Sequence, residues 1–251
     1  MTEGLLRGMS ALVTGGARGL GRAIIDAFAA AGARGIAFDL TGPADDLPRG
    51  WTLETGDVTK EEDIERACQR AKASFGRLDC LVANAGLVPP WRDSTAIDLA
   101  EWDQVFAINV RGVAASIKHA APLMRPGGGS VIAMASSNAL HAHPRQMAYV
   151  ASKHAVVGIT RAAARDLGRF AIRVNALAPG PIGTEALLRR LVEREVEGGP
   201  KAETALQRYA ETPLARMATE IEVASAAVFL ASPLSAGITG QILPIDAGLT
   251  P

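Results

Sequence analysis

Short apolar runs alternate with longer segments of helical periodicity along most of the 251 residues. The runs are apolar at nearly every position, which is typical of parallel strands that are buried on both faces. In the segments between them, apolar residues recur every three or four positions, as on helices that bury one side. The pattern predicts strands at Met9–Thr14, Gly35–Leu40, Trp51–Gly56, Leu78–Ala83, Ser130–Ala135, Ile172–Leu177 and Gln241–Ile245, and helices at Leu20–Ala31, Glu61–Phe75, Glu101–Met124, Tyr149–Leu167 and Glu220–Leu230.

This alternation predicts an α/β fold with a doubly wound parallel sheet of the Rossmann type, about seven strands wide and covered by helices on both faces. No linker or repeat interrupts the pattern, so we expect a single domain over residues 1–251. Leu40–Gly50 is short and rich in Gly and Pro, which predicts a turn or a brief helical piece. Thr184–Thr212 is an irregular, highly charged excursion, interpreted either as a solvated surface segment or as a mobile lid over a site.

Charge and cysteine content exclude several classes of protein. With 26 Lys plus Arg against 26 Asp plus Glu, the chain has no net charge that would attract nucleic acid or a membrane surface, so neither is expected as a partner. Cys68 and Cys80 lack the spacing of a disulfide or zinc framework and are expected to be free thiols. The sequence shows no signal peptide and no apolar run of membrane-spanning length, which indicates a cytoplasmic location.

A glycine-rich segment, Thr14–Gly21, follows the first expected strand and opens the first expected helix. Glycines there allow a tight turn and let the backbone approach a pyrophosphate, which the N–H groups of the helix N-terminus would bind. Asp39, at the end of the second strand, can accept hydrogen bonds from both hydroxyls of an adenosine ribose, and its charge repels a 2′-phosphate. NAD is therefore favoured over NADP. Arg18 leaves NADP possible, since its guanidinium could serve a 2′-phosphate, pair with Asp39 or lie at the surface.

Tyr149 and Lys153 are four residues apart, so on a helix their side chains lie on the same face one turn apart. The chain has only two tyrosines, which lowers the frequency of such a pair by chance. A phenol has a pKa of about 10, and an ammonium one turn away favours the phenolate. The pair is therefore a candidate acid/base unit, and a solvent-facing helix pair is the alternative without function.

Four motifs occur in order: Thr14-Gly15-x-x-x-Gly19-x-Gly21, Asn84-Ala85-Gly86, Tyr149-x-x-x-Lys153 and Pro179-Gly180-Pro181-Ile182-x-Thr184. Together they resemble the short-chain dehydrogenase/reductase family over about Arg7 to Gly248, nearly the whole chain. The resemblance implies hydride exchange between C4 of a nicotinamide and a carbinol or carbonyl carbon. It also implies cofactor contacts at Gly15, Arg18, Gly19, Leu20, Gly21, Asp39, Leu40, Asp57, Val58, Asn84, Ala85, Gly86, Tyr149, Lys153, Pro179, Gly180, Ile182 and Thr184.

The same resemblance implies catalytic roles. Tyr149 would take the hydroxyl proton in oxidation and return it in reduction, while Lys153 would tune Tyr149 and bind the nicotinamide ribose. Ser136 would hold the substrate oxygen, because it precedes Tyr149 by 13 residues as is usual in the family, whereas Ser137 would need a deletion in the loop. Asn109 matches a helix asparagine that holds a water linked to the lysine, and a local helix distortion is a second explanation for it.

Residues around the substrate are predicted from position alone. Trp91, Asn138, His143 and Gln146 are candidates for a polar small-molecule pocket. His141-Ala142-His143 has no evident third ligand, so no metal site is expected. His119 and His154 fall on expected helices, which in the family pack between subunits and imply a dimer or tetramer.

The leading interpretation is an NAD-dependent alcohol, polyol or sugar dehydrogenase, or the corresponding ketone reductase. The alternative enzyme is a 3-oxoacyl-thioester (acyl-carrier-protein) reductase that uses NADPH, which would call for a basic patch near the site and a cation in place of Asp39; neither is evident. A cofactor-binding regulatory protein is the alternative outside enzymes. A Rossmann methyltransferase fits less well, because it has no use for the Tyr149–Lys153 pair.

Overall fold

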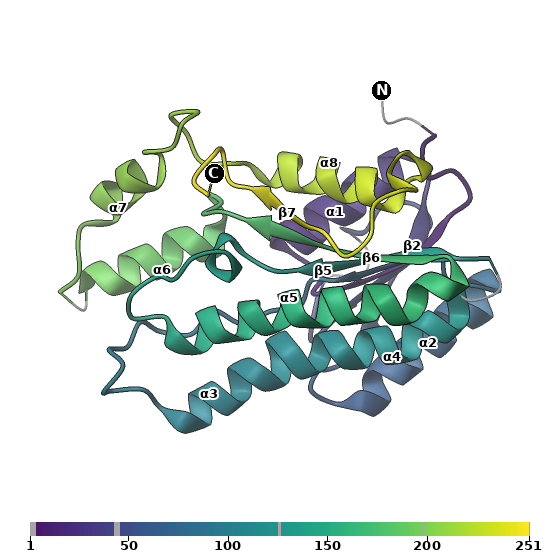
Figure 1. Cartoon of the computed structure of the whole chain (residues 1–251), viewed down its shortest axis with the longest axis horizontal. Coiled ribbons are helices and arrows are strands. Elements are labelled where there is room, and N and C mark those ends of the chain that lie inside the picture. Colours follow the sequence, from purple (N-terminus) through teal and green to yellow (C-terminus); the bar gives the residue numbers. More distant parts are fainter. Residues whose placement is uncertain (1–3, 43–45, 125–126, 197, 251) are drawn as a thin grey trace.

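The computed structural model describes residues 4–42, 46–124, 127–196 and 198–250. Seven parallel strands form one sheet in the order β3-β2-β1-β4-β5-β6-β7 (Figure 1). The chain adds strands outward from β1 in one direction and then, starting with β4, in the other, so the strand order reverses between β1 and β4. This confirms the predicted doubly wound parallel sheet. The strands are β1 (Ser10–Thr14), β2 (Arg34–Asp39), β3 (Trp51–Thr55), β4 (Cys80–Ala83), β5 (Gly129–Met134), β6 (Ile172–Pro179) and β7 (Ile242–Ile245).

Helices cover both faces of the sheet, with α1 (Gly19–Ala30) and α8 (Glu220–Ala231) on one side and α2 (Glu61–Phe75), α4 (Gly112–Met124) and α5 (Met147–Leu167) on the other (Figure 1). Adjacent strand residues enter different cores: Leu12 packs with the α2, α4 and α5 layer, and Val13 packs with the α1 and α8 layer. Both are fully buried. Burial on both faces is the reason that the strands are apolar throughout instead of alternating.

The helix expected at Glu101–Met124 begins earlier and is not regular. It starts as α3 (Leu99–Phe106), where the Asp98 carboxylate accepts hydrogen bonds from the backbone N–H groups of Ala100 and Glu101 at 2.9 and 3.2 Å. Such a cap satisfies donors that the first helical turn leaves free. A π-helical turn, η2 (Ala107–Arg111), then separates α3 from α4.

The expectation of an irregular segment at Thr184–Thr212 is wrong, because most of it forms two helices, α6 (Glu185–Val196) and α7 (Ala202–Tyr209). Leu187 and Leu191 of α6 pack against Ala205 of α7 in a small separate core. The charged residues between these leucines obscured their helical spacing. Figure 1 shows α6 and α7 at the end of the molecule where α5 and α3 begin.

The described part of Leu40–Gly50 contains no α-helix, and residues 43–45 lie outside the described residues. Single 3-10 turns connect other elements: η3 (Ser137–Ala139), η4 (Gly168–Phe170) and η5 (Pro233–Ser235). Within the described ranges, no helix combines the length and the apolar character that crossing a membrane requires.

Candidate active site

The glycine-rich turn after β1 is shaped by close backbone contacts. Gly15 has φ +64°, and a Cβ there would lie 2.9 Å from the Cα of Ala85. A Cβ on Gly21 would collide with the carbonyl of Gly15. Gly19, with φ +54°, begins α1. The turn thus brings backbone N–H groups to a helix N-terminus, which fits a dinucleotide pyrophosphate.

The end of β4 is tied to this turn. The backbone N–H groups of Asn84 and Ala85 donate to Thr14 Oγ1 at 3.0 and 3.1 Å, and the Asn84 amide donates to the carbonyls of Thr14 and Gly15 at 3.0 Å. Gly86 follows beside the opposite end of the site, since a Cβ there would lie 3.4 Å from Asn109 Oδ1 and 3.6 Å from Lys153 Nζ. The Asn84–Gly86 segment therefore lies between the glycine turn and the catalytic candidates.

The Asp39 carboxylate is fixed at the carboxyl end of β2. It accepts hydrogen bonds from the backbone N–H groups of Ala17 at 3.0 Å and Leu40 at 2.8 Å. Arg18 is exposed, and within the described residues no ion pair joins it to Asp39. Its exposed position leaves the side chain in contact with solvent.

The other predicted cofactor residues lie on loops that follow strands at the same edge of the sheet, where parallel α/β sheets bind ligands. Asp57 caps its own loop by accepting a hydrogen bond from Thr59 N at 2.8 Å. Thr184 Oγ1 accepts a hydrogen bond from Leu187 N at 3.2 Å, so Thr184 also starts α6. Of the remaining predicted contacts, Val58, Gly180 and Ile182 lie in these loops, and Pro179 is the last residue of β6.

Ser136 and Tyr149 come together although different elements carry them. Ser136 follows β5, Tyr149 lies in the first turn of α5, and their side chains form a hydrogen bond. Burial raises the pKa of Tyr149, and this hydrogen bond and the charge of Arg190 both act in the opposite direction. A phenol in hydrogen-bond contact with a buried serine forms a site that can both orient a hydroxyl or carbonyl oxygen and exchange its proton.

Lys153 lies one turn beyond Tyr149 and is buried, with 4% of its surface exposed. Its Nζ donates to the carbonyl of Met134 at 2.7 Å and lies 5.6 Å from the centroid of the Tyr149 ring. Burial lowers the pKa of Lys153 to about 8. The charge of Arg190 also acts to lower the pKa of the Tyr149 phenol.

Asn109 lies inside the π-helical turn and is fully buried. Its Oδ1 accepts from Leu87 N at 2.7 Å, and its Nδ2 donates to Leu87 O at 2.9 Å and to Ser152 Oγ at 3.1 Å. The helix distortion expected as one explanation is therefore present. It turns Asn109 toward the loop after β4 and toward α5.

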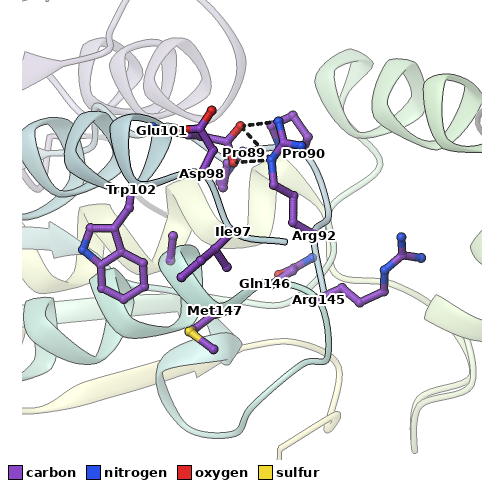
Figure 2. A pocket seen from close by; sticks show the side chains of 11 residues that line it. Pro89, Pro90, Arg92, Ile97, Asp98, Glu101, Trp102, Arg145, Gln146 and Met147 are labelled. Atoms are coloured by element: carbon purple, nitrogen blue, oxygen red, sulfur yellow. Dashed lines mark hydrogen bonds and ion pairs between the residues drawn. The ribbon is translucent and has the colours of Figure 1, made fainter. Parts of the chain in front are cut away.

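The four substrate candidates form two pairs. The rings of Trp91 and His143 lie 4.7 Å apart, and Asn138 Nδ2 donates to Gln146 Oε1 at 2.6 Å. Gln146 also lines a small pocket between the loop after β4 and the starts of α3 and α5, shown in Figure 2. That lining contains none of Ser136, Tyr149 and Lys153, and the ion pair of Arg92 with Glu101 closes one side of the pocket.

Sequence reasoning missed two arginines of α6. Arg194 stacks on Trp91, with its guanidinium carbon 3.4 Å from the ring centroid, and Arg190 interacts electrostatically with Tyr149. The spacing of Arg190 and Arg194 puts them on one helix face, next to the face of Leu187 and Leu191. That spacing can be seen in the sequence, but the residues that this face of α6 contacts cannot.

The remaining histidines and cysteines lie apart from this site or act locally. His119 pairs with Glu61 at 2.9 Å, and His154 contacts the carbonyl of Val150. Burial raises the pKa of both Cys68 and Cys80 to about 12, and neither forms a disulfide. Among the described residues, no group of three or more His, Cys, Asp or Glu is arranged to hold a metal ion.

Comparison with known proteins identifies the family. Residues 15–250 match the family described as Enoyl-(Acyl carrier protein) reductase. The chain is 37% identical to xanthoxin dehydrogenase of Arabidopsis thaliana, over 98% of this chain and 90% of that protein. It is 36% identical to a 3-oxoacyl-(acyl-carrier-protein) reductase of Thermotoga maritima, over 97% and 98%. The crystal structure of carveol dehydrogenase from Mycobacterium avium in complex with NAD superposes with a TM-score of 0.88 at 31% identity, over 98% of both chains.

These similar proteins are named as dehydrogenases and reductases, so the chain is an oxidoreductase of a secondary alcohol or its ketone and uses a nicotinamide cofactor. This activity agrees neither with the regulatory-protein alternative nor with the methyltransferase alternative. From the order of its motifs, the strand order of its sheet and these comparisons, the chain belongs to the short-chain dehydrogenase/reductase family.

Proposed function

We propose that the protein is an NAD-dependent dehydrogenase of a secondary alcohol of the alcohol, polyol or sugar class, and the reductase of the corresponding ketone. The observation that carries this proposal is the contact of Ser136 with Tyr149 beside buried Lys153, at the same sheet edge as the glycine turn and Asp39. A bound nicotinamide supplies the hydride acceptor in oxidation and the hydride donor in reduction.

Tyr149 handles the proton in this proposal. During oxidation the hydroxyl proton of the substrate passes to the Tyr149 phenolate as the C–H electron pair leaves with the hydride, and during reduction the phenol returns that proton to the developing alkoxide. Ser136 donates a hydrogen bond to the same substrate oxygen, which fixes the carbon that reacts. Tyr149 thus changes charge during turnover, whereas Ser136 only orients the substrate oxygen.

Lys153 and Asn109 support that step. A buried amine whose pKa is about 8 can hold or release a proton near neutral pH, so Lys153 can return the proton of Tyr149 to solvent as well as bind the nicotinamide ribose. Asn109, with its amide held by Leu87 and Ser152, keeps the loop after β4 against α5. It therefore positions Gly86 beside Lys153.

The preference for NAD rests on Asp39. Its carboxylate is held by two backbone N–H groups at the end of β2, beside the glycine turn. A ribose 2′-hydroxyl can donate to such an acceptor, while a 2′-phosphate would bring two negative charges together. The exposed side chain of Arg18 does not neutralise Asp39 by an ion pair among the described residues.

A 3-oxoacyl-thioester reductase that uses NADPH is the second candidate. The name of the Thermotoga maritima relative and the description of the matching family favour it. Asp39 disfavours it, for the reason just given. The two functions differ both in cofactor and in substrate, so one assay separates them.

We further propose that the protein is a homo-oligomer, either a tetramer or a dimer, that assembles through the outer faces of α4 and α5. Each subunit acts in the cytoplasm as a single domain, with α6 and α7 as a lid over the active site. Light scattering after size-exclusion chromatography measures the assembly directly. A monomer at micromolar concentration would contradict it.

The proposed activity is tested by absorbance at 340 nm. Alcohols, polyols, sugars, hydroxy acids and 3-oxoacyl thioesters are screened with NAD(H) and NADP(H) in parallel. We expect turnover of a secondary alcohol with NAD and a higher KM with NADP. Faster reduction of 3-oxoacyl thioesters with NADPH would favour the second candidate instead.

A further inference from the structure

Arg190 of α6 carries a charge that the described part of the protein leaves uncompensated. Its side chain is half-buried, and its Nε is fully buried and has no hydrogen-bond partner. Among the described residues, no carboxylate forms an ion pair with Arg190. Burying part of a guanidinium without an anion costs free energy, because the solvent that stabilised the charge is removed.

The electrostatic neighbours of Arg190 do not supply that anion. They are the phenols of Tyr149 and Tyr209 and two further arginines, Arg189 and Arg194. Burial lowers the pKa of Arg190, as expected for a cation in this setting, although a guanidinium stays charged. The charge therefore acts on the site that holds Tyr149 and has no counter-charge there.

A pair of aromatic rings lies against the face of α6 that carries Arg190 and Arg194. Arg194, one turn after Arg190, stacks on Trp91 at 3.4 Å, and Trp91 in turn contacts His143 at 4.7 Å. Trp91 Nε1 is buried and has no hydrogen-bond partner among the described residues either. Two unpartnered donors, Arg190 Nε and Trp91 Nε1, thus lie on α6 and on the loop that α6 contacts through Arg194.

We infer that Arg190 binds a carboxylate of the substrate, so that the substrate of the proposed dehydrogenase is a hydroxy acid and its product the corresponding keto acid. The inference rests on the proposed function of the Tyr149 site. A planar guanidinium with several free N–H donors matches a carboxylate in shape and charge, and the bond is charge-assisted. Neutral alcohols and sugars would leave the charge of Arg190 uncompensated.

The carboxylate must belong to a compact substrate. The unpartnered Arg190 Nε lies one helical turn from Arg194, which stacks on Trp91 in the loop after β4, and the charge of Arg190 interacts with Tyr149, so the inferred anion and the hydroxyl that meets Tyr149 belong to one small molecule. The phosphate of a long thioester arm is many bonds from the reacting carbonyl and would lie outside this position. A docking surface for an acidic carrier protein would instead use exposed basic residues, whereas both Arg190 and Arg194 are half-buried.

Binding of two probes that differ only in charge tests the inference. Cyclohexanecarboxylate and cyclohexanecarboxamide are titrated by calorimetry into the protein saturated with NADH, whose nicotinamide carries no positive charge. The wild type should bind the carboxylate about tenfold or more tightly than the amide, the effect of one charge-assisted hydrogen bond. Arg190→Leu and Arg190→Gln should abolish this preference, and Arg189→Leu, which removes an exposed arginine of the same helix, should retain it.

Equal affinities for the two probes in the wild type, or no measurable binding of the carboxylate, would overturn the inference. So would a preference that survives in Arg190→Leu or Arg190→Gln at an unchanged melting temperature. A rise in the Kd for NADH in these variants with the carboxylate preference intact would place Arg190 on the cofactor phosphates and would also overturn it. Because binding is measured without turnover, a failure of the proposed function, seen as no NAD reduction by any alcohol, is distinguishable from each of these results.

Discussion

Asn109 and Leu87 exchange two hydrogen bonds, with Leu87 N donating to Asn109 Oδ1 at 2.7 Å and Asn109 Nδ2 donating to Leu87 O at 2.9 Å. The pair joins the π-helical turn to the loop after β4. It exists because the distorted turn directs the amide out of the helix and toward that loop.

Asn109→Ala should therefore destabilise the protein. The substitution leaves both polar groups of Leu87 without their partner, which costs about 1–3 kcal/mol of unfolding free energy. Urea denaturation measures the loss. Ser152→Ala, which removes one hydrogen bond to Asn109 and leaves the Leu87 pair intact, is the matched control and should lose less. Equal stability of Asn109→Ala and the wild type would contradict this role.

Asp39→Ala should change cofactor selectivity. The ratio of kcat/KM for NAD to that for NADP should fall roughly tenfold or more, because a charged acceptor of ribose hydrogen bonds is lost and the repulsion of a 2′-phosphate disappears. Initial rates at 340 nm give both values. Asp46→Ala is the control, since Asp46 pairs with Arg22 and is not in the cofactor prediction. A selectivity ratio that Asp39→Ala leaves unchanged would refute the assignment.

The buried amine of Lys153 should make stability depend on pH. Below about pH 8 both the folded and the unfolded chain hold its proton, and between about pH 8 and the ordinary value of 10.5 only the unfolded chain does. Stability rises with pH where the unfolded state binds more protons, so the wild type should gain on the order of 3 kcal/mol relative to Lys153→Met across that window.

Guanidinium denaturation at several pH values from 7 to 10 measures this difference. Lys72→Met removes an exposed lysine of α2 and controls for the loss of a positive charge. A difference between wild type and Lys153→Met that is flat with pH would mean that burial does not shift the pKa of Lys153.

Arg190 should also affect the pH profile of turnover with a neutral alcohol. Its charge lowers the pKa of Tyr149, so Arg190→Leu should move the rise of kcat/KM for oxidation to higher pH. Because the substrate is neutral, this shift is independent of carboxylate binding. Arg189→Leu should leave the profile in place. A profile that is identical in Arg190→Leu and the wild type would remove Arg190 from the electrostatics of Tyr149.

Much of this architecture could be predicted from the sequence. Continuous apolar runs and helical periodicity predict the sheet and its main helices, because burial on two faces or on one leaves different patterns. The glycine turn and Asp39 were predictable because tight backbone contacts and a strand end constrain residue type. Local spacing also brought Tyr149 and Lys153 to one helix face.

Contacts between distant segments could not be predicted in this way. The periodicity of α6 indicates which side of the helix packs on α7, but not that the charge of Arg190 acts on Tyr149 or that Arg194 stacks on Trp91. The π-helical turn at Asn109 likewise occurs together with hydrogen bonds to Leu87 and Ser152, which are far away in the chain. The direction of Lys153 Nζ toward Met134 depends on the packing of α5 against β5.

Comparison of Tyr149→Phe with the wild type tests the central claim most directly, once a substrate is found by the NAD-linked screen. Loss of the phenolic proton should lower kcat by about 10²–10⁴-fold, while the Kd for NAD, measured by calorimetry, stays within about twofold. Tyr209→Phe, at the only other tyrosine, should retain activity. A Tyr149→Phe enzyme with the kcat of the wild type would contradict the assignment of Tyr149 as the acid/base.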